Sequence, residues 1–186
     1  LLRSDIYDIA RYGTELGMRM VMAVNGTLIT DTVARQLVDA GIQRISVSLD
    51  GSSPETHDRF RQVEGAFEGT LRGIDLLKKA GMEFQINTTI TKTNLDQIPK
   101  IQQLAVDLGA VAHHIFLLVP TGRGKYIVDQ EIDAAEYEST LNWFYDQRDK
   151  TPLQLKATCA PHYYRILRQR AKKDGISVTF QTHGLD

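Results

Sequence analysis

Apolar and polar residues alternate along two short runs of this chain, with the two-residue period of a β-strand that has two different faces. The runs cover residues 44–50 and 84–91. In the first run the apolar face carries Ile45, Val47 and Leu49, and the polar face carries Ser46, Ser48 and Asp50. In the second run the polar face carries Gln85, Asn87, Thr89 and Thr91. The recurrence predicts two neighbouring strands whose polar faces line a shared cavity.

Longer segments with a 3.6-residue apolar period separate these runs and predict helices. The predicted helices cover residues 4–16, 30–40, 67–79, 98–108, 133–148 and 161–173, and the predicted strands cover residues 18–24, 44–49, 83–90, 111–119 and 177–181. The first four helices each end at a glycine that leads into a strand, and glycine suits the left-handed position that ends a helix. Thr30 is expected to cap the second helix, and Asn94 or Asp96 to open the fourth. Between the last two helices we expect a linker that contains Thr151-Pro152.

Helices that alternate with strands predict an α/β fold with a parallel sheet, open or curling into part of a barrel. Helices then cover the apolar face, so the polar face looks into a barrel or cleft. Ligands of such folds bind at the carboxyl ends of the strands. The sequence therefore predicts a site for a polar small molecule near Asp50.

Composition narrows the range of partners. The chain has 186 residues, of which 42% are hydrophobic and 24% charged, as in ordinary globular proteins. A formal net charge of -1 leaves no broad basic surface, which argues against nucleic acid or a membrane as the main partner. The single cysteine excludes an internal disulfide and fits a cytoplasmic protein. Because the sequence opens without a methionine or a targeting segment, we expect an internal piece of a longer protein.

Several residues are candidates for binding. Ser48, Asp50 and Asn87 suit hydrogen bonds to a ribose or an amino-acid head group, although they would also serve merely to end their strands. Asn25, before a glycine, is first a turn residue and second a ligand contact. Arg61 lies one helical turn after His57 and suits a carboxylate, with a solvated polar face as the alternative.

Other candidates carry weaker signals. His113 and His114 are adjacent on a strand, so their rings point to opposite faces and do not chelate one metal. The basic loop at residues 120–125 lacks the spacing of a phosphate loop, and a carboxylate-binding or lid role is the interpretation. Cys159 is a candidate ligand of an auxiliary metal cluster, although a lone cysteine is more often structural.

Together these residues resemble the radical S-adenosylmethionine enzymes. Residues 47–51 (VSLDG), followed by residues 57–61 (HDRFR), are similar to that family's Ser-x-Asp-Gly region at its fourth strand, and residues 86–89 (INTT) to its fifth strand. Leu1-Leu2 is similar to the residues that follow a Gly-Gly-Glu-Pro segment. The resemblance implies a partial TIM-like (β/α)6 barrel truncated at its N-terminus. Residues 1–125 would form the barrel without its first two strands and cluster loop, and residues 126–186 a helical part that closes the barrel or leads to an auxiliary-cluster domain.

The resemblance also implies cofactors. Ser48, Asp50, Asn87, Arg61 and Asn25 would approach S-adenosylmethionine. A 4Fe-4S cluster, whose three-cysteine motif is not in this chain, would reduce it to a 5′-deoxyadenosyl radical that abstracts hydrogen from substrate. An electron donor such as flavodoxin or ferredoxin is then required. The chain alone would be inactive.

A narrower resemblance rests on residues 118–124 (LVPTGRG) and 158–166 (TCAPHYYRI), which look like the branch that acts on modified tetrapyrroles. It implies oxidative decarboxylation of a propionate to a vinyl group in haem biosynthesis, as in the haem synthase and haem d1 enzymes. The residues expected to meet propionates are Arg123, Lys125, His162 and Arg165. The alternatives are a peptide-modifying maturase with a C-terminal cluster domain and a non-catalytic binding module.

Overall fold

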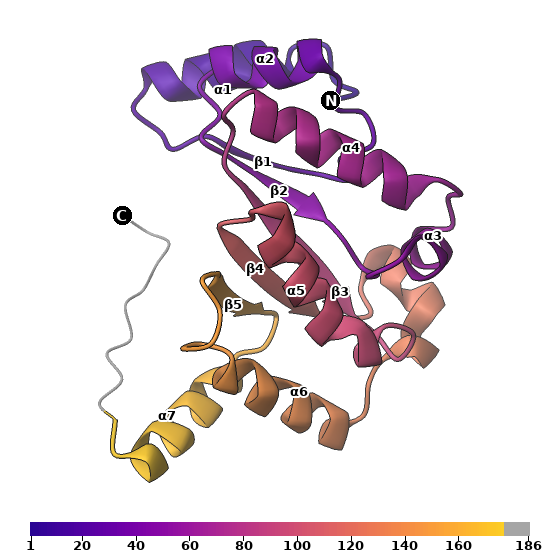
Figure 1. Ribbon diagram of the computed structural model, residues 1–186, viewed down its shortest axis with the longest axis vertical. Helices are drawn as coiled ribbons and strands as arrows, with labels where there is room; N and C mark the ends of the chain where they lie inside the picture. Colours follow the sequence, from indigo (N-terminus) through magenta and orange to yellow (C-terminus); the bar gives the residue numbers. More distant parts are fainter. Residues whose placement is uncertain (177–186) are drawn as a thin grey trace.

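A computed structural model describes residues 1–176 as helices arranged around one parallel sheet (Figure 1). The strands are β1 (Val21–Val24), β2 (Arg44–Ser48), β3 (Phe84–Ile90), β4 (Ala112–Leu117) and β5 (Gln154–Thr158). The α-helices are α1 (Ile6–Glu15), α2 (Asp31–Asp39), α3 (Pro54–Arg61), α4 (Ala66–Lys79), α5 (Ile98–Leu108), α6 (Ala134–Asp146) and α7 (Tyr163–Asp174). Two 3-10 segments, η1 (Leu95–Gln97) and η2 (Gly122–Gln130), complete the described elements. The strand predicted at residues 177–181 lies outside the described residues.

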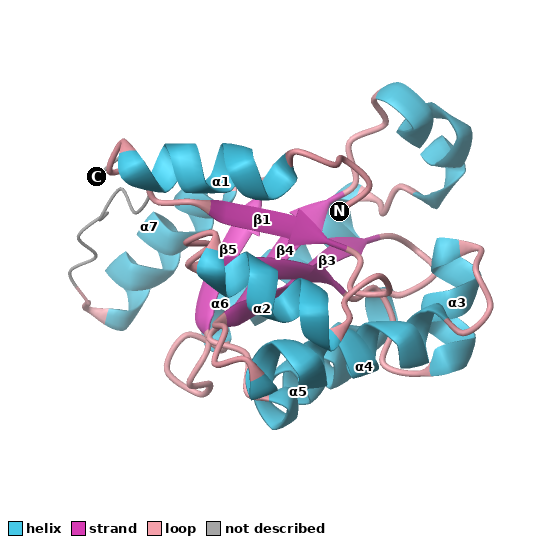
Figure 2. Cartoon of the chain, turned by 90° about the horizontal axis from the view of Figure 1, so that it is seen from above, coloured by secondary structure: helices cyan, strands magenta, loops and turns pink. Residues whose placement is uncertain are grey.

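The five strands lie in the order β1-β2-β3-β4-β5, and every neighbouring pair is parallel. A sheet whose sequential strands are all parallel needs a crossover between each pair, and helices provide the crossovers here. Figure 2 shows α2, α4 and α5 along one side of the sheet. The predicted α/β fold with a parallel sheet is confirmed, and it is consistent with part of a TIM-like barrel.

The predicted helix ends are confirmed by the backbone. Gly17, Gly41, Gly81 and Gly109 all adopt positive φ angles, between 73° and 82°, directly after their helices. Only glycine adopts this conformation without a steric penalty, so each one ends its helix and releases the chain toward the next strand. The hydroxyl of Thr30 accepts a 3.2 Å hydrogen bond from the Val33 N–H, as expected of a helix cap.

Two segments differ from the sequence prediction. The expected linker contains β5, in which Leu155 and Ala157 alternate with Gln154 and Lys156. This strand is short, and Leu155 and Ala157 are only partly buried, so its alternation is weak in the sequence. The basic loop overlaps the start of η2, a 3-10 segment that continues to Gln130 with a kink at Ile127. The sheet therefore continues one strand beyond the four predicted from the first 125 residues.

The apolar face of the sheet forms the core. Ile45, Val47 and Leu49 on β2 and its end are fully buried, as are Ile86 and Ile90 on β3. They pack against apolar residues of α2, α4 and α5, among them Leu37, Ile74, Leu77, Ile101 and Ala105. Burial of each such side chain contributes roughly 1.5–3 kcal/mol to folding. Across residues 1–176, none of the helices combines the length and apolarity that a bilayer span requires.

Candidate functional site

The polar face of the sheet carries a continuous row of hydrogen-bonding side chains. In the strand register Ser48 is paired with Asn87, Asn87 with His114, and His114 with Lys156, so all four side chains lie on the same face. Ser48 is the last residue of β2, whereas Lys156 is in the middle of β5. The row therefore crosses the sheet from the end of β2 to the edge strand β5.

This polar face is concave. Arg44 on β2 donates to the Oε1 atom of Gln154 on β5 over 3.5 Å. In a flat sheet β2 and β5 would lie about 14 Å apart, because neighbouring strands are spaced by about 4.8 Å. The two side chains reach each other across β3 and β4 because the sheet curves around them. The polar residues thus line a hollow, as the sequence predicts for a cavity shared by neighbouring strands.

Ser48 and Asn87 lie together at the rim of the hollow, and both are half-buried. Asn87 accepts a 2.9 Å hydrogen bond from the amide of Gln85 through Oδ1. Within residues 1–176 neither the Ser48 hydroxyl nor the Asn87 amide N–H₂ makes a side-chain hydrogen bond. These two groups are therefore free to bind a polar ligand.

Asp50 is buried at the end of β2 and is already fully engaged. Its Oδ1 atom accepts a 2.7 Å hydrogen bond from the Thr89 backbone N–H, and its Oδ2 atom forms an ion pair with Arg61. Burial raises the pKa of the carboxyl, while the Arg61 guanidinium and the Thr89 N–H lower it. Asp50 thus holds the tips of β2 and β3 together, and it presents no free oxygen to the hollow.

Two residues of α3 support Asp50. The Nδ1 atom of His57 accepts a 3.1 Å hydrogen bond from the Asp50 backbone N–H. Burial, and then the charge of Arg61, lower the pKa of His57 to about 4, so the ring is neutral at neutral pH. Arg61 keeps 30% of its side chain exposed while it pairs with Asp50. Of the candidates on α3, Arg61 is the one with a part that reaches solvent near the rim.

Asparagines shape the two loops beside this rim. The Oδ1 atom of Asn25 accepts hydrogen bonds from the Thr27 backbone N–H and hydroxyl, which makes the turn that the sequence predicts. Asn94 is fully buried, and its amide donates to the backbone carbonyls of Asp50 and Thr89. Sequence reasoning treats Asn94 as a helix cap and misses this bridge, because nothing in the local pattern reveals a contact 44 residues away.

The two adjacent histidines point to opposite faces, as predicted. His113 is fully buried on the helix side, where its Nε2 atom lies 3.0 Å from the Thr88 hydroxyl and its ring meets Phe144 edge-on. His114 lies on the polar face, 2.9 Å from the Gln85 amide through Nδ1. Burial lowers the pKa of His113 to about 3 and that of His114 to about 4. Both rings are neutral at neutral pH.

The four residues expected to meet propionates lie on two elements. Arg123 and Lys125 belong to η2, and Lys125 is exposed. His162 precedes α7 and packs against the ring of Tyr137, with 4.3 Å between ring centres. Arg165 on α7 forms an ion pair with Glu138 on α6. Within the described residues, Lys125 makes no hydrogen bond or ion pair with His162 or Arg165.

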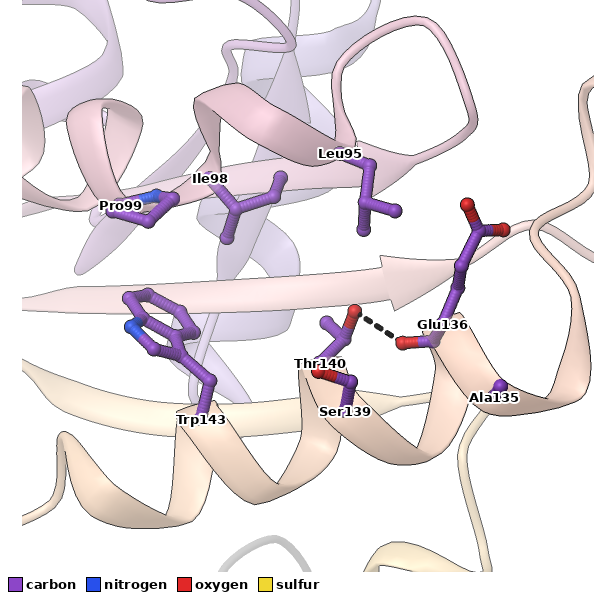
Figure 3. A pocket seen from close by; sticks show the side chains of 8 residues that line it. All are labelled: Leu95, Ile98, Pro99, Ala135, Glu136, Ser139, Thr140 and Trp143. Atoms are coloured by element: carbon purple, nitrogen blue, oxygen red, sulfur yellow. Dashed lines mark hydrogen bonds between the residues drawn. The ribbon is translucent and has the colours of Figure 1, made fainter.

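A groove on the outside of the molecule is a different feature. It lies between the start of α5 and α6, as Figure 3 shows, and its lining consists of Leu95, Ile98, Pro99, Ala135, Glu136, Ser139, Thr140 and Trp143. Two of its polar residues serve α6 itself: the Thr140 hydroxyl donates to the Glu136 carbonyl, and the Glu136 carboxylate accepts from the Asp133 backbone N–H. The groove is largely apolar and lies away from the polar face. We do not assign it to the site.

The described residues do not form a ligand set for a metal ion or an iron-sulfur cluster. Residues 1–176 contain no group of three His, Cys, Asp or Glu side chains that would hold a metal ion. Cys159 is exposed and adopts a φ of 59°. As the only cysteine of the sequence it supplies one thiolate, so this chain does not by itself form the three-cysteine set of a 4Fe-4S cluster. The open hydroxyl and amide at the rim do suit the ribose and amino-acid groups of S-adenosylmethionine.

Comparison with known proteins identifies the family. The profile of the radical SAM superfamily matches residues 1–105. The whole chain is 55% identical to the AdoMet-dependent heme synthase of Methanosarcina barkeri and 57% identical to that of Oleidesulfovibrio alaskensis, and it covers 53% and 48% of those proteins. The chain thus spans about half the length of the curated relatives it matches.

A solved structure agrees on the fold. Streptococcus suis SuiB bound to S-adenosylmethionine superposes with a TM-score of 0.69 at 15% identity, over 96% of this chain and 39% of that one. The resemblance inferred from the VSLDG and INTT segments is confirmed: this chain belongs to the radical S-adenosylmethionine superfamily.

Proposed function

We propose that this chain is part of a radical S-adenosylmethionine enzyme that decarboxylates a tetrapyrrole propionate in haem biosynthesis. The observation that carries the proposal is the identity of 55–57% with two AdoMet-dependent heme synthases over the full length of the chain. The concave polar face, with free groups on Ser48 and Asn87, supports the cofactor part of the proposal.

In this proposal Ser48 and Asn87 bind the cofactor directly. Their hydroxyl and amide face the hollow from paired positions and suit the ribose or the methionine part of S-adenosylmethionine. Arg61 would meet the cofactor carboxylate with the exposed part of its guanidinium. Asp50 acts through Arg61 and through the strand tips, and Asn25 shapes the neighbouring turn. Bound S-adenosylmethionine supplies hydrogen-atom abstraction once an electron reaches it.

The substrate would meet the basic residues that follow β4 and β5. Arg123 and Lys125 are the proposed propionate partners on η2, and His162 is the proposed partner at the start of α7. Arg165 would have to exchange Glu138 for a propionate, because its charge is already paired. Cys159 would serve as a ligand only if further thiolates come from outside this chain.

Other parts of the proposal concern the complete protein. We propose that residues 126–176 continue and close the barrel, with β5 next to β4 as support. A cytoplasmic location and an electron donor such as flavodoxin or ferredoxin fit the chemistry. The cluster would come from residues that this chain does not contain.

The test uses the complete protein with its reconstituted cluster. Anaerobic incubation with S-adenosylmethionine, a reductant and iron-coproporphyrin III should yield 5′-deoxyadenosine together with a porphyrin that has lost carbon dioxide. Both products are measured by liquid chromatography and mass spectrometry. Cofactor cleavage without loss of carbon dioxide from the porphyrin would contradict the substrate assignment. The absence of cofactor cleavage would contradict the enzyme assignment as well.

A second measurement addresses the two rim residues. Ser48→Ala and Asn87→Ala should each weaken S-adenosylmethionine binding roughly tenfold, because each removes a hydrogen bond from a partly desolvated group. Gln103→Ala, on the outer face of α5, is the matched control and should bind the cofactor like the wild type. Unchanged affinity in both rim variants would remove Ser48 and Asn87 from the cofactor site.

A further inference from the structure

Beyond the rim, the polar face of the sheet gathers basic side chains. Arg44, His114 and Lys156 all lie on this face, on β2, β4 and β5. The charges of Lys156 and Arg44 both reach His114, since each contributes to lowering its pKa. The ring of His114 is neutral, so the cations of the group are Arg44 and Lys156, and Glu83, directly before β3, pairs with Arg44. The hollow therefore favours an anionic ligand.

Arg44 is mostly buried and is held by two contacts. Its Nη2 atom pairs with Glu83 over 3.1 Å, and its Nη1 atom reaches Gln154. Only 17% of the side chain is exposed, and its Nε–H is buried without a hydrogen-bond partner. This Nε atom is closed to solvent, so Arg44 contributes its positive charge to the hollow and not a further hydrogen bond to a ligand.

His114 presents a neutral N–H donor to the same hollow. The Gln85 amide nitrogen lies 2.9 Å from Nδ1 of His114 and 2.9 Å from Oδ1 of Asn87. An amide N–H₂ group only donates, so Nδ1 accepts and the neutral ring carries its proton on Nε2. Within residues 1–176 this Nε2–H has no hydrogen-bond partner.

Lys156 is the exposed charge of the group. It is paired in register with His114 and makes no ion pair or hydrogen bond within residues 1–176. It lies two strands away from the proposed cofactor residue Asn87 on β3, so the two sites are neighbours along the row.

We infer that Lys156 and His114, with the positive charge of Arg44 beside them, form a recognition site for a carboxylate of the substrate inside the hollow. This inference rests on the proposed function, which supplies a substrate with several carboxylates. The site differs from the propionate partners proposed on η2 and α7, because it lies on the sheet itself. It would orient the substrate by holding one carboxylate while another part reacts.

The test measures binding of iron-coproporphyrin III to the complete protein through the shift of the Soret band. Lys156→Met should raise the dissociation constant roughly tenfold, since it removes one charge-assisted contact. The dissociation constant of Lys156→Arg should stay within about threefold of the wild-type value, because arginine keeps the charge. Lys100→Met, an exposed lysine on α5, is the matched control and should leave binding unchanged. The tetramethyl ester of the same porphyrin should bind the wild type and Lys156→Met equally.

Each contrary outcome has a distinct meaning. If the wild type binds the porphyrin and Lys156→Met binds it equally well, the inference is wrong and the proposed function is unaffected. If Lys156→Met weakens S-adenosylmethionine binding and leaves the porphyrin unaffected, the site belongs to the cofactor and the inference is also wrong. If the wild type does not bind the porphyrin, the proposed substrate is wrong, and the inferred carboxylate site is wrong as well.

Discussion

The Oδ1 atom of Asp50 accepts a 2.7 Å hydrogen bond from the Thr89 backbone N–H, which joins the tip of β2 to the neighbouring strand β3. Asp50 is fully buried, and its other oxygen is paired with Arg61. Two residues earlier, Ser48 lies beside Asn87 at the rim of the hollow. The buried carboxylate therefore fixes the spacing of the two strands that carry the proposed cofactor contacts.

Replacing Asp50 by asparagine should lower stability. Asp50→Asn keeps an acceptor for Thr89 but removes the charge that compensates Arg61, so we expect the free energy of unfolding to fall by about 1–3 kcal/mol. Urea denaturation followed by circular dichroism measures the change. Asp96→Asn, at an exposed position of η1, is the control and should shift the free energy by less than about 0.5 kcal/mol. Equal midpoints for Asp50→Asn and the wild type would show that the pair adds no stability.

His113 should make the protein sensitive to acid. Its folded-state pKa is lowered to about 3 by burial, whereas an exposed histidine in the unfolded chain takes up a proton near pH 6.5. His113 therefore makes its full contribution to the free energy of unfolding above about pH 6.5. This contribution is lost as the pH falls toward 3. At pH 5 this one residue accounts for about 2 kcal/mol.

The measurement compares urea denaturation at about pH 7.5 and about pH 5 for the wild type and His113→Gln. The variant is expected to be less stable at both values, since glutamine fills the space beside Phe144 imperfectly. Its loss of stability between the two pH values should nevertheless be smaller than that of the wild type by about 2 kcal/mol. The same pH dependence in both proteins would mean that His113 does not resist protonation.

Replacing either of two glycines of α4 by alanine should change the stability of the protein to different extents. A Cβ atom on Gly73 would lie 2.2 Å from the backbone oxygen of Gly26, whereas on Gly69 it would lie 3.2 Å from the Thr27 Cγ2 atom. Gly73→Ala should therefore destabilise the protein by about 1–3 kcal/mol, because the loop after β1 has to move. Gly69→Ala should be close to neutral, since better helix propensity, by about 1 kcal/mol, offsets a small steric adjustment. Thermal unfolding of both variants is the test, and equal melting temperatures would contradict the close approach of α4 to Gly26.

The parts of this fold that the sequence predicts are those governed by local rules. The glycines at 17, 41, 81 and 109 end helices because of a backbone preference that does not depend on tertiary contacts. The alternation in β2 predicts which side chains are buried, and the structure buries Ile45, Val47 and Leu49 as expected. The opposite directions of His113 and His114 follow from the same two-residue period.

The parts that escape prediction depend on contacts between distant segments. Asp50 has the same local pattern whether it faces a ligand or pairs with Arg61, and only the position of α3 decides between them. Arg44 and Gln154 are 110 residues apart, so no local signal indicates that they meet across the hollow. The sequence predicts a linker where β5 lies, and a linker gives no sign that Lys156 completes the row.

Arg61 connects the structural and the proposed binding roles at the rim, and a pair of variants separates the two. Arg61→Gln removes the positive charge while leaving Asp50 in place, so it should weaken S-adenosylmethionine binding roughly tenfold and also lower stability. Asp50→Asn lowers stability but leaves the guanidinium charge, so its effect on cofactor affinity should be less than about threefold. Equilibrium dialysis with the complete protein measures both affinities. If the two variants lose affinity in proportion to their loss of stability, Arg61 acts only by holding the strand tips, and the cofactor carboxylate must be bound by another group.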